Sequence, residues 1–201
     1  MTPPSAGAAR ARPARDWLEL TTIGGVLARG AARRPEHDSL VFPDGRETYA
    51  ETLASSYAVA RSLRAHGVGR GDVVVILMPN CPAFVHAFFA CAHLGARALL
   101  VNARYKTHEL AHVLRDAGVA AVLTTDLVSE HVDFVPLLDA VPSEARPRLR
   151  VMLGESAPPG FVNRASFLEA SAGVTLDAVR GEAAAVRIRC VGHLLYTSGT
   201  T

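Results

Sequence analysis

The strongest constraint on the fold is a series of short apolar runs separated by stretches with helical periodicity. Val73–Leu77 reads VVVIL and contains no polar residue, which is typical of a strand buried on both faces. Further strands are predicted at Leu99–Val101, Val119–Leu123, Leu149–Leu153 and Ile188–Tyr196. Strands that alternate with helices predict an α/β fold, a layered domain built on a mainly parallel sheet.

The helix before the first buried strand carries the clearest local signals. Thr48 and Glu51 have the spacing of a capping box, in which each residue bonds to the backbone of the other. Apolar residues then recur in steps of three and four, and Gly67 ends the helix. Those apolar positions are Leu53, Tyr57, Ala60 and Leu63.

The other elements follow from similar patterns. A helix is predicted at Ile23–Arg33, and two short strands, Leu40–Phe42 and Glu47–Tyr49, flank a Pro-Asp-Gly turn. A further helix is predicted to open at Asn80 and Pro82, and its residues through Leu94 are apolar nearly all round, so it is expected to be buried. Two more helices are predicted at about Thr107–Ala117 and Leu127–Leu138. Residues 154–185, rich in Ala, Gly and Ser, show only a weak helix near Phe167.

Composition excludes several classes of protein. The 201 residues are 49% hydrophobic and 20% charged, as expected for a globular protein. A net charge of +2 is too small to indicate a nucleic-acid or membrane partner. The apolar stretch from Cys81 to Val101 is interrupted by Pro, His, Gly and Arg, so no transmembrane segment is predicted.

Features of the start of the chain and of its cysteines bear on location. Residues 1–17 are rich in Arg, Pro and Ala without an apolar run, which predicts a flexible tail; an organelle transit peptide is the alternative. The cysteines Cys81, Cys91 and Cys190 form no C-x-x-C pair, and the first two lie in apolar surroundings. A reducing, cytoplasmic location is therefore expected. His86 and His93 lie on the predicted buried helix and are expected to be core histidines.

The segment that can carry chemistry is Gly192–Thr201, in which a predicted strand ends in hydroxyl residues around a glycine. Gly199 can adopt positive φ, so that successive N–H groups point into one concavity, and Ser and Thr hydroxyls add donors for phosphate oxygens. Taken on spacing alone, such a cluster of Ser, Thr and Gly is more often an ordinary polar loop.

Four blocks in order resemble the AMP-forming acyl-CoA synthetases, the adenylate-forming superfamily of AMP-dependent synthetases and ligases. Tyr196–Thr201 (YTSGTT) resembles the start of its phosphate-loop signature, which normally continues Gly-x-Pro-Lys. Earlier blocks resemble the family's opening helix and turn (from Thr48 to Asp72), its first buried strand and following helix (VVILMPNCPAF), and the N-x-R-Y…E-L block at Asn102–Leu110.

The resemblance implies an acid–thiol ligase. ATP activates a carboxylic acid, either a medium- or long-chain fatty acid or an aryl or alicyclic acid, to an acyl-adenylate, and coenzyme A then takes the acyl group. Oxide is a poor leaving group and AMP is a good one, which is why activation is needed. By analogy, the residues that would hold the ATP phosphates with Mg²⁺ are Thr197, Ser198, Gly199, Thr200 and Thr201.

The resemblance also implies that much of the enzyme is missing from these 201 residues. Residues 18–201 are expected to be the N-terminal part of the adenylation domain, truncated within the phosphate loop, with no catalytic residue in the chain. The isolated chain is therefore expected to be inactive. The alternative is a non-catalytic fragment or interaction module, and an in-frame Gly-x-Pro-Lys encoded after Thr201 would favour the enzyme.

A competing motif is His108-Glu109-Leu110-Ala111-His112, which matches the H-E-x-x-H signature of zinc hydrolases. On a helix, the two histidines lie opposite the apolar stripe that begins at Leu110, so the face that would bind the metal is expected to be solvated. The G-x-x-H continuation is absent, and Glu130 is the available third ligand by position. A zinc-dependent hydrolase is therefore the distant alternative, and no metal site is predicted.

Overall fold

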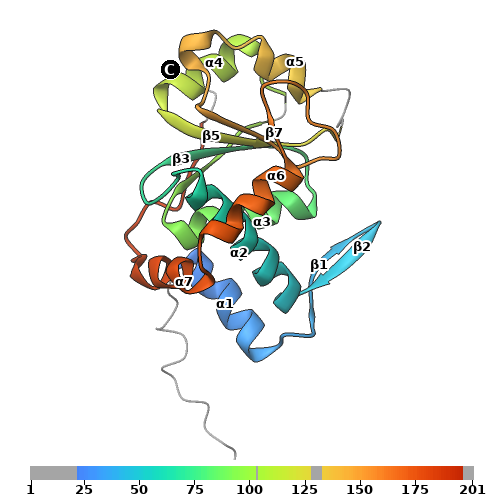
Figure 1. Ribbon diagram of the computed structural model, residues 1–201, viewed down its shortest axis with the longest axis vertical. Helices are drawn as coiled ribbons and strands as arrows, with labels where there is room; N and C mark the ends of the chain where they lie inside the picture. The colour runs from blue at the N-terminus through green and yellow to red at the C-terminus, as the bar shows by residue number, and fades with distance from the viewer. Residues whose placement is uncertain (1–21, 103, 128–132, 197–201) are drawn as a thin grey trace, which may run out of the picture.

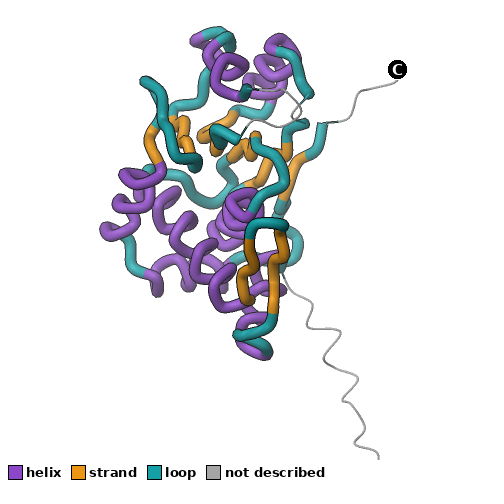
Figure 2. The backbone as a smooth tube through the Cα atoms, turned by 90° about the vertical axis from the view of Figure 1, so that its right-hand side faces the viewer, coloured by secondary structure: helices purple, strands orange, loops and turns teal. Residues whose placement is uncertain are grey.

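The chain forms a sheet enclosed between two layers of helices, with a separate β-hairpin beside it (Figures 1 and 2). The computed structural model describes residues 22–102, 104–127 and 133–196. The six-stranded sheet has the order β7-β6-β5-β3-β4-β8, and every neighbouring pair in it is parallel. The predicted α/β class with a mainly parallel sheet is confirmed.

The central strand β3 (Val73–Leu77) is completely buried, as its continuous apolar sequence predicts. Alternate residues contact opposite helical layers, because successive side chains of a strand point to opposite faces. Val74 and Ile76 join the core beneath α2 and α3, whereas Val73, Val75 and Leu77 join the core beneath α4. The other strands are β4 (Arg97–Leu100), β5 (Val119–Thr124), β6 (Leu149–Met152), β7 (Val162–Asn163) and β8 (His193–Leu194).

The larger helical layer is built around α2 (Tyr49–Ala65) and α3 (Pro82–Leu94), which pack against each other. The predicted capping box is present: Glu51 N–H donates to Thr48 Oγ1 at 3.2 Å, and the Glu51 carboxylate accepts from Thr48 N–H at 2.8 Å. The hydrogen bond from Thr48 N–H, together with one from the Thr48 hydroxyl at 2.9 Å, lowers the pKa of the Glu51 carboxyl. The layer is completed by α1 (Ile23–Arg33), α6 (Arg164–Glu169), a 3₁₀ turn (Ala170–Gly173) and α7 (Leu176–Ala185).

The opposite layer contains α4 (Thr107–Asp116) and α5 (Phe134–Asp139), followed by a 3₁₀ turn (Ser143–Ala145). Leu110 and Leu114 of α4, together with Phe134 and Leu138 of α5, are buried against the sheet. The connection after β3 enters the first layer and the connection after β5 enters the second. Neighbouring strands whose connections leave to opposite faces form a topological switch point, where α/β proteins commonly bind ligands.

The hairpin consists of β1 (Asp38–Phe42) and β2 (Gly45–Thr48), paired antiparallel. It agrees with the two predicted strands, except that Tyr49 begins α2 instead of ending the strand. The helix Ile23–Arg33 is confirmed with both of its bounds.

Other predictions need correction. The predicted strand Ile188–Tyr196 is reduced to His193–Leu194, which pairs with β4 alone among the described strands, and Ile188 is 72% exposed. Of the predicted helix Leu127–Leu138, residues 128–132 lie outside the described part, and α5 begins at Phe134. Helix α3 is continuously buried only from Ala90 to Leu94, since Phe84, Val85, Phe88 and Phe89 are part-exposed.

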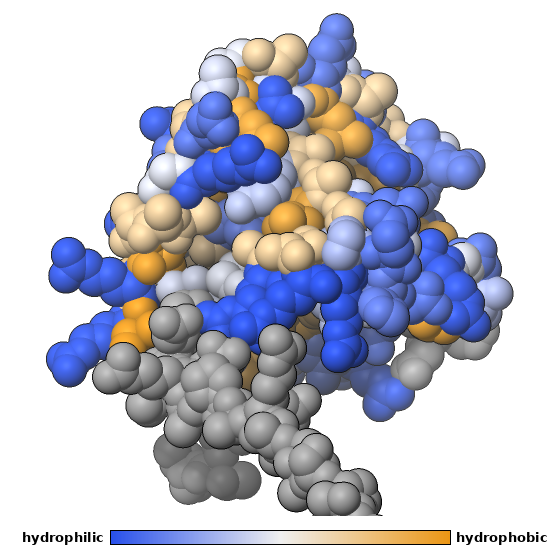
Figure 3. Space-filling view, turned by 90° about the horizontal axis from the view of Figure 1, so that it is seen from below, coloured by the Kyte–Doolittle hydropathy of each residue, from blue (hydrophilic) through white to orange (hydrophobic). Residues whose placement is uncertain are grey.

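The buried cysteines and the core histidine are confirmed. Cys81 and Cys91 are buried, and burial raises the pKa of the Cys91 thiol to about 12. His93 is 1% exposed, whereas His86 is only part-buried and pairs with Glu47. No helix among the described residues is long and apolar enough to cross a membrane. The molecular face formed around α1 and α7 shows apolar patches separated by hydrophilic side chains (Figure 3).

Candidate functional site at the carboxyl edge of the sheet

All six strands of the sheet run in the same direction, so the chain leaves every strand at one common edge. In open α/β sheets, ligands bind in the crevice outside this carboxyl edge. The segments that begin there include Asn102 after β4, Thr125 and Asp126 after β5, Gly154 after β6 and Tyr196 after β8. The carboxyl edge is therefore the part of the described structure to search for a site.

Strand β8 leads to the predicted phosphate-binding residues. It pairs with β4 in the register Ala98↔His193 and Leu99↔Leu194, and Ala98 N–H donates to Gly192 O at 3.0 Å. Tyr196 follows at the carboxyl edge, with its side chain among those that pack against the core beneath α4. The predicted phosphate-binding residues themselves lie outside the described part of the chain: Thr197, Ser198, Gly199, Thr200 and Thr201.

Tyr196 is held by two hydrogen bonds from elsewhere in the chain. Tyr105 Oη donates to Tyr196 O at 3.3 Å, and Tyr196 Oη donates to the carboxylate of Asp116 at the end of α4. The hydrogen bond to Asp116, with burial and charge repulsion as smaller causes, raises the pKa of Tyr196 to about 12. The phenol therefore keeps its proton at neutral pH, and the end of β8 is fixed against α4 and the segment before it.

The Asn102–Leu110 block folds as a turn that starts α4. Arg104 N–H donates to Asn102 Oδ1 at 2.9 Å, and Lys106 N–H donates to the Glu109 carboxylate at 2.7 Å. An ammonium group cannot accept a hydrogen bond, so only the Glu109 half of a capping box is formed. This turn places Tyr105 within reach of Tyr196. The resemblance had singled out the block, but nothing local in the sequence predicts that Tyr105 and Asp116 both bond to Tyr196.

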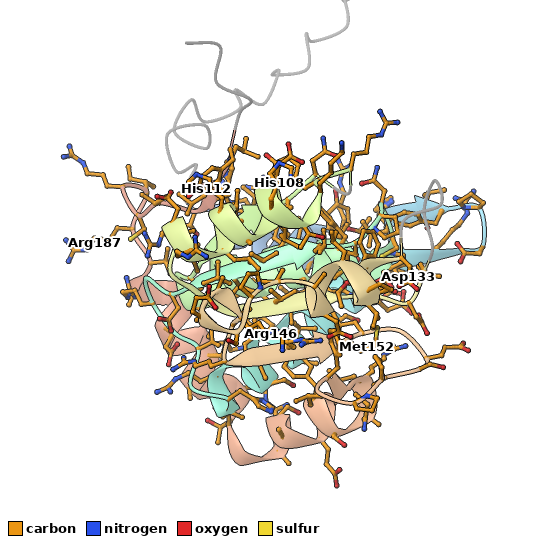
Figure 4. All side chains as sticks on the ribbon, turned by 90° about the horizontal axis from the view of Figure 1, so that it is seen from above. His108, His112, Asp133, Arg146, Met152 and Arg187 are labelled. Atoms are coloured by element: carbon orange, nitrogen blue, oxygen red, sulfur yellow. The ribbon has the colours of Figure 1, made fainter. Side chains whose placement is uncertain are left out.

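The zinc motif lies on the solvent side of α4. His108, Glu109 and His112 are exposed, while Leu110 and Val113 are buried, and Figure 4 shows both histidines on the outer side of the helix. Within the described residues, no group of three or more His, Cys, Asp or Glu could hold a metal ion. Glu130, the possible third ligand, lies outside the described part. The solvated metal-binding face expected from the helical periodicity is confirmed.

The parallel sheet, with β8 ending at its carboxyl edge, is one observation about the family of this chain. A comparison of the sequence with protein families is the second. Residues 27–201 match the family model described as AMP-binding enzyme. The chain belongs to the AMP-binding enzyme family. The expected membership of the AMP-dependent synthetase and ligase superfamily is thereby confirmed, as is the expected fold.

Curated relatives of the chain include CoA ligases. It is 30% identical over 182 residues to 2-succinylbenzoate–CoA ligase of Bacillus subtilis, which covers 90% of this chain and 32% of the relative. It is 31% identical over 188 residues to a long-chain-fatty-acid–CoA ligase of Mycobacterium tuberculosis, covering 90% and 33%. The chain thus spans about a third of the length of these relatives.

Solved structures of CoA ligases resemble the described structure. The inhibitor-bound N-terminal domain of FACL13 from Mycobacterium tuberculosis superposes with a TM-score of 0.65 at 28% identity, covering 90% of this chain and 42% of that one. The anthranilate CoA ligase AuaEII with anthranoyl-AMP gives the same TM-score at 23% identity, over 74% of this chain and 28% of that one, which supports the fold alone. The described structure is therefore that of the N-terminal part of such enzymes.

Proposed function

We propose that this chain is the first part of the adenylation domain of an acyl-CoA ligase, with residues 18–201 belonging to that domain. The parent enzyme would activate a carboxylic acid with ATP and transfer its acyl group to the thiol of coenzyme A. The observation that carries the proposal is the position of Tyr196. It follows the parallel strand β8 at the carboxyl edge of the sheet, so the predicted phosphate-binding segment begins where α/β proteins bind ligands.

The donor set of that segment fits phosphate. Thr197, Ser198, Thr200 and Thr201 supply hydroxyl donors, and Gly199 allows the backbone N–H groups of the segment to converge on an anion. Mg²⁺ would offset the charge of the triphosphate. The residues described here contribute by positioning: Tyr105 and Asp116 hold Tyr196 and thereby the start of the segment.

The substrate is proposed only as a class. The named relatives act on long-chain fatty acids, on 2-succinylbenzoate and on hydroxybenzoates. We propose a fatty acid as the first candidate for the carboxylic acid substrate and an aryl acid as the second.

The test is AMP formation from ATP in the presence of coenzyme A and a panel of acids: hexanoate, palmitate, benzoate and cyclohexanecarboxylate. The protein is expressed both as these 201 residues and as the whole reading frame that contains them. We expect activity only from the longer protein. Ser198→Ala should lower kcat/KM about ten- to a hundredfold, the effect of one hydrogen bond to a charged group.

Ser143→Ala is the matched control, because Ser143 lies in the 3₁₀ turn of the α4 layer, away from β8. It should leave kcat/KM unchanged. If the longer protein forms no AMP with any acid of the panel, or if the reading frame stops after Thr201, a non-catalytic interaction module replaces the ligase.

A further inference from the structure

A second part of the carboxyl edge is hollowed into a pocket. It has a volume of about 820 Å³ and lies between the ends of β5 and β6, the start of α3 and the β1–β2 hairpin. The exits of β3 and β5 form the topological switch point of the sheet, and residues from both, Cys81 and Thr125, line the pocket. Strands β3 and β4 separate the pocket's β5–β6 wall from β8, so this pocket is not the segment discussed above.

The floor of the pocket is apolar. Val59 of α2, Ala83 of α3, Leu153 after β6 and Leu168 of α6 contribute hydrocarbon surface. Burial raises the pKa of the Cys81 thiol, so Cys81 adds a neutral surface as well. A pocket of this size and character suits the body of a small organic molecule.

One polar part of the pocket lining is the hydrogen-bonded pair of Glu47 and His86. His86 Nε2 lies 2.7 Å from Glu47 Oε2, with 14% and 25% of the two side chains exposed, and Thr52 Oγ1 donates to the same oxygen at 3.4 Å. Both contacts use Oε2 of Glu47. No described residue donates to Oε1 of Glu47, so this carboxylate retains acceptor capacity at the pocket wall.

A second polar part of the lining is Asp126, which ties together the exits of β5 and β6. Asp126 Oδ2 accepts from the N–H groups of Glu155 and Ser156, both at 2.9 Å. A Cβ added at Gly154 would overlap this carboxylate, so the glycine is needed for the close approach. Oδ1 of Asp126 receives no hydrogen bond from any described residue. The carboxylate is therefore held rigidly, with Oδ1 packed against Gly154 and bonded to no described donor.

The charge of the lining is unbalanced. The lining contains four carboxylates but one guanidinium, that of the exposed Arg164, and one imidazole, that of His86, which pairs with Glu47. The carboxylates are those of Asp44, Glu47, Asp126 and Glu155. The two inner carboxylates each have an unused acceptor, and the lining offers few competing donors. A bare metal ion does not fit, because no described group of His, Cys, Asp and Glu is close enough to hold one.

We propose that this pocket binds a small organic cation, with an apolar body on the floor and a protonated amine, amidine or guanidine bound by the carboxylates of the lining, Glu47 and Asp126 first. This goes beyond the proposed ligase reaction, whose acid and triphosphate are both anionic. A cationic end matches the unused carboxylate oxygens, and the charge of an anionic end would be repelled by them.

The test uses three probes of nearly equal shape and different charge: benzamidinium, benzamide and benzoate. Each is titrated into the 201-residue chain at pH 7 and followed by ligand-observed NMR. We expect benzamidinium to bind about five- to tenfold more tightly than benzamide, with benzoate weakest. Benzoate binding as tightly as benzamidinium would overturn the proposal.

Variants locate the binding. Glu47→Gln keeps the shape of the side chain and should weaken benzamidinium about fivefold or more, with benzamide within about twofold. Asp126→Asn should act in the same direction, and circular dichroism verifies that each variant is folded. Ala83→Leu fills the floor without changing charge and should weaken all three probes.

Glu182→Gln is the control, since Glu182 pairs with Arg64 outside this pocket. It should leave all three affinities unchanged. If Glu47→Gln and Asp126→Asn both fold and bind benzamidinium as the unmodified chain does, the pocket is not a cation site.

Discussion

Ser56 and His93 form a buried hydrogen bond between α2 and α3, with 3.0 Å from Oγ to Nε2. The Ser56 hydroxyl donates its proton to Leu53 O at 2.8 Å, so it must accept from His93 Nε2–H. This fixes the tautomer of His93 and leaves Nδ1 as a bare acceptor, buried without a hydrogen-bond partner among the described residues. The ring also stacks on Tyr57 at 4.3 Å between centroids.

The first prediction concerns the dependence of stability on pH. Burial lowers the pKa of His93 to about 4, below its usual 6.5, so the unfolded state binds this proton more readily. The contribution to the free energy of unfolding is fully present above pH 6.5 and is lost as pH falls toward 4. The loss should be about 3 kcal/mol across that window.

The measurement is urea unfolding at several pH values between 4 and 7.5, comparing the unmodified chain with His93→Leu. The difference between the two free energies of unfolding should change with pH over this window. His108→Leu is the control, because His108 is exposed on α4, and its difference should stay constant. A constant difference for His93→Leu as well would contradict a neutral buried imidazole.

The second prediction concerns the glycine beneath this histidine. A Cβ on Gly24 would lie 2.8 Å from His93 Nδ1, and both residues are buried, so Gly24→Ala should destabilise the fold by about 1–3 kcal/mol. Gly181 is also helical and has open space around it, so Gly181→Ala should stabilise by up to about 1 kcal/mol. The measurement is the denaturant midpoint of unfolding for each of the two variants. Equal shifts of both midpoints in the same direction would show that helix propensity alone determines the effect of the added methyl group.

The third prediction concerns the anchor of β8. Tyr105→Phe removes the hydrogen bond to Tyr196 O, which should loosen β8 and speed exchange of the Ala98 amide, whose acceptor is Gly192 O. One neutral hydrogen bond corresponds to about a two- to tenfold change in exchange rate. The Arg97 amide donates to Asp72 O at 2.8 Å and serves as the internal reference. Unchanged protection of Ala98 would show that β8 does not depend on Tyr105.

Much of the central fold can be predicted from the sequence because its signals are local. The bounds of β3 follow from five consecutive apolar residues, and the start of α2 follows from Thr48 and Glu51. The buried face of α2 is less predictable: Ser56 and Ser62 are completely buried, because their hydroxyls donate to backbone carbonyls of their own helix. An apolar pattern alone cannot reveal such satisfied polar groups.

The rest depends on contacts between distant residues. Tyr105 and Tyr196 are 91 positions apart, and no periodicity links them. Strand β7 has two residues, which is too short for an alternating pattern, and its position is set by pairing with β6. The pocket between β5 and β6 is likewise assembled from loops and helices whose proximity only the folded chain reveals.

The fourth prediction concerns zinc. Because His108 and His112 lie on the exposed face of α4, the purified chain should contain no stoichiometric zinc. Elemental analysis after dialysis measures the metal content, with His108→Ala as the comparison. One equivalent of zinc that disappears in His108→Ala would restore the hydrolase interpretation.

The fifth prediction concerns the exposed edge beside β8. Apolar side chains are concentrated in the segment around this strand: Ile188, Val191 and Leu195 are 72%, 54% and 63% exposed, and β8 pairs with β4 alone among the described strands. An open edge with exposed apolar residues promotes association, so the isolated 201-residue chain should self-associate and bind a hydrophobic dye strongly.

Replacing these three residues together by Ser should reduce dye fluorescence and shift the chain toward monomer in sedimentation velocity. Val41 is also exposed, at 59%, but lies in the separate hairpin, so Val41→Ser is the matched control and should change neither measurement. If the unmodified chain is a monodisperse monomer with a sharp cooperative melt, the prediction is contradicted. The exposed edge of β8 would then not cause association.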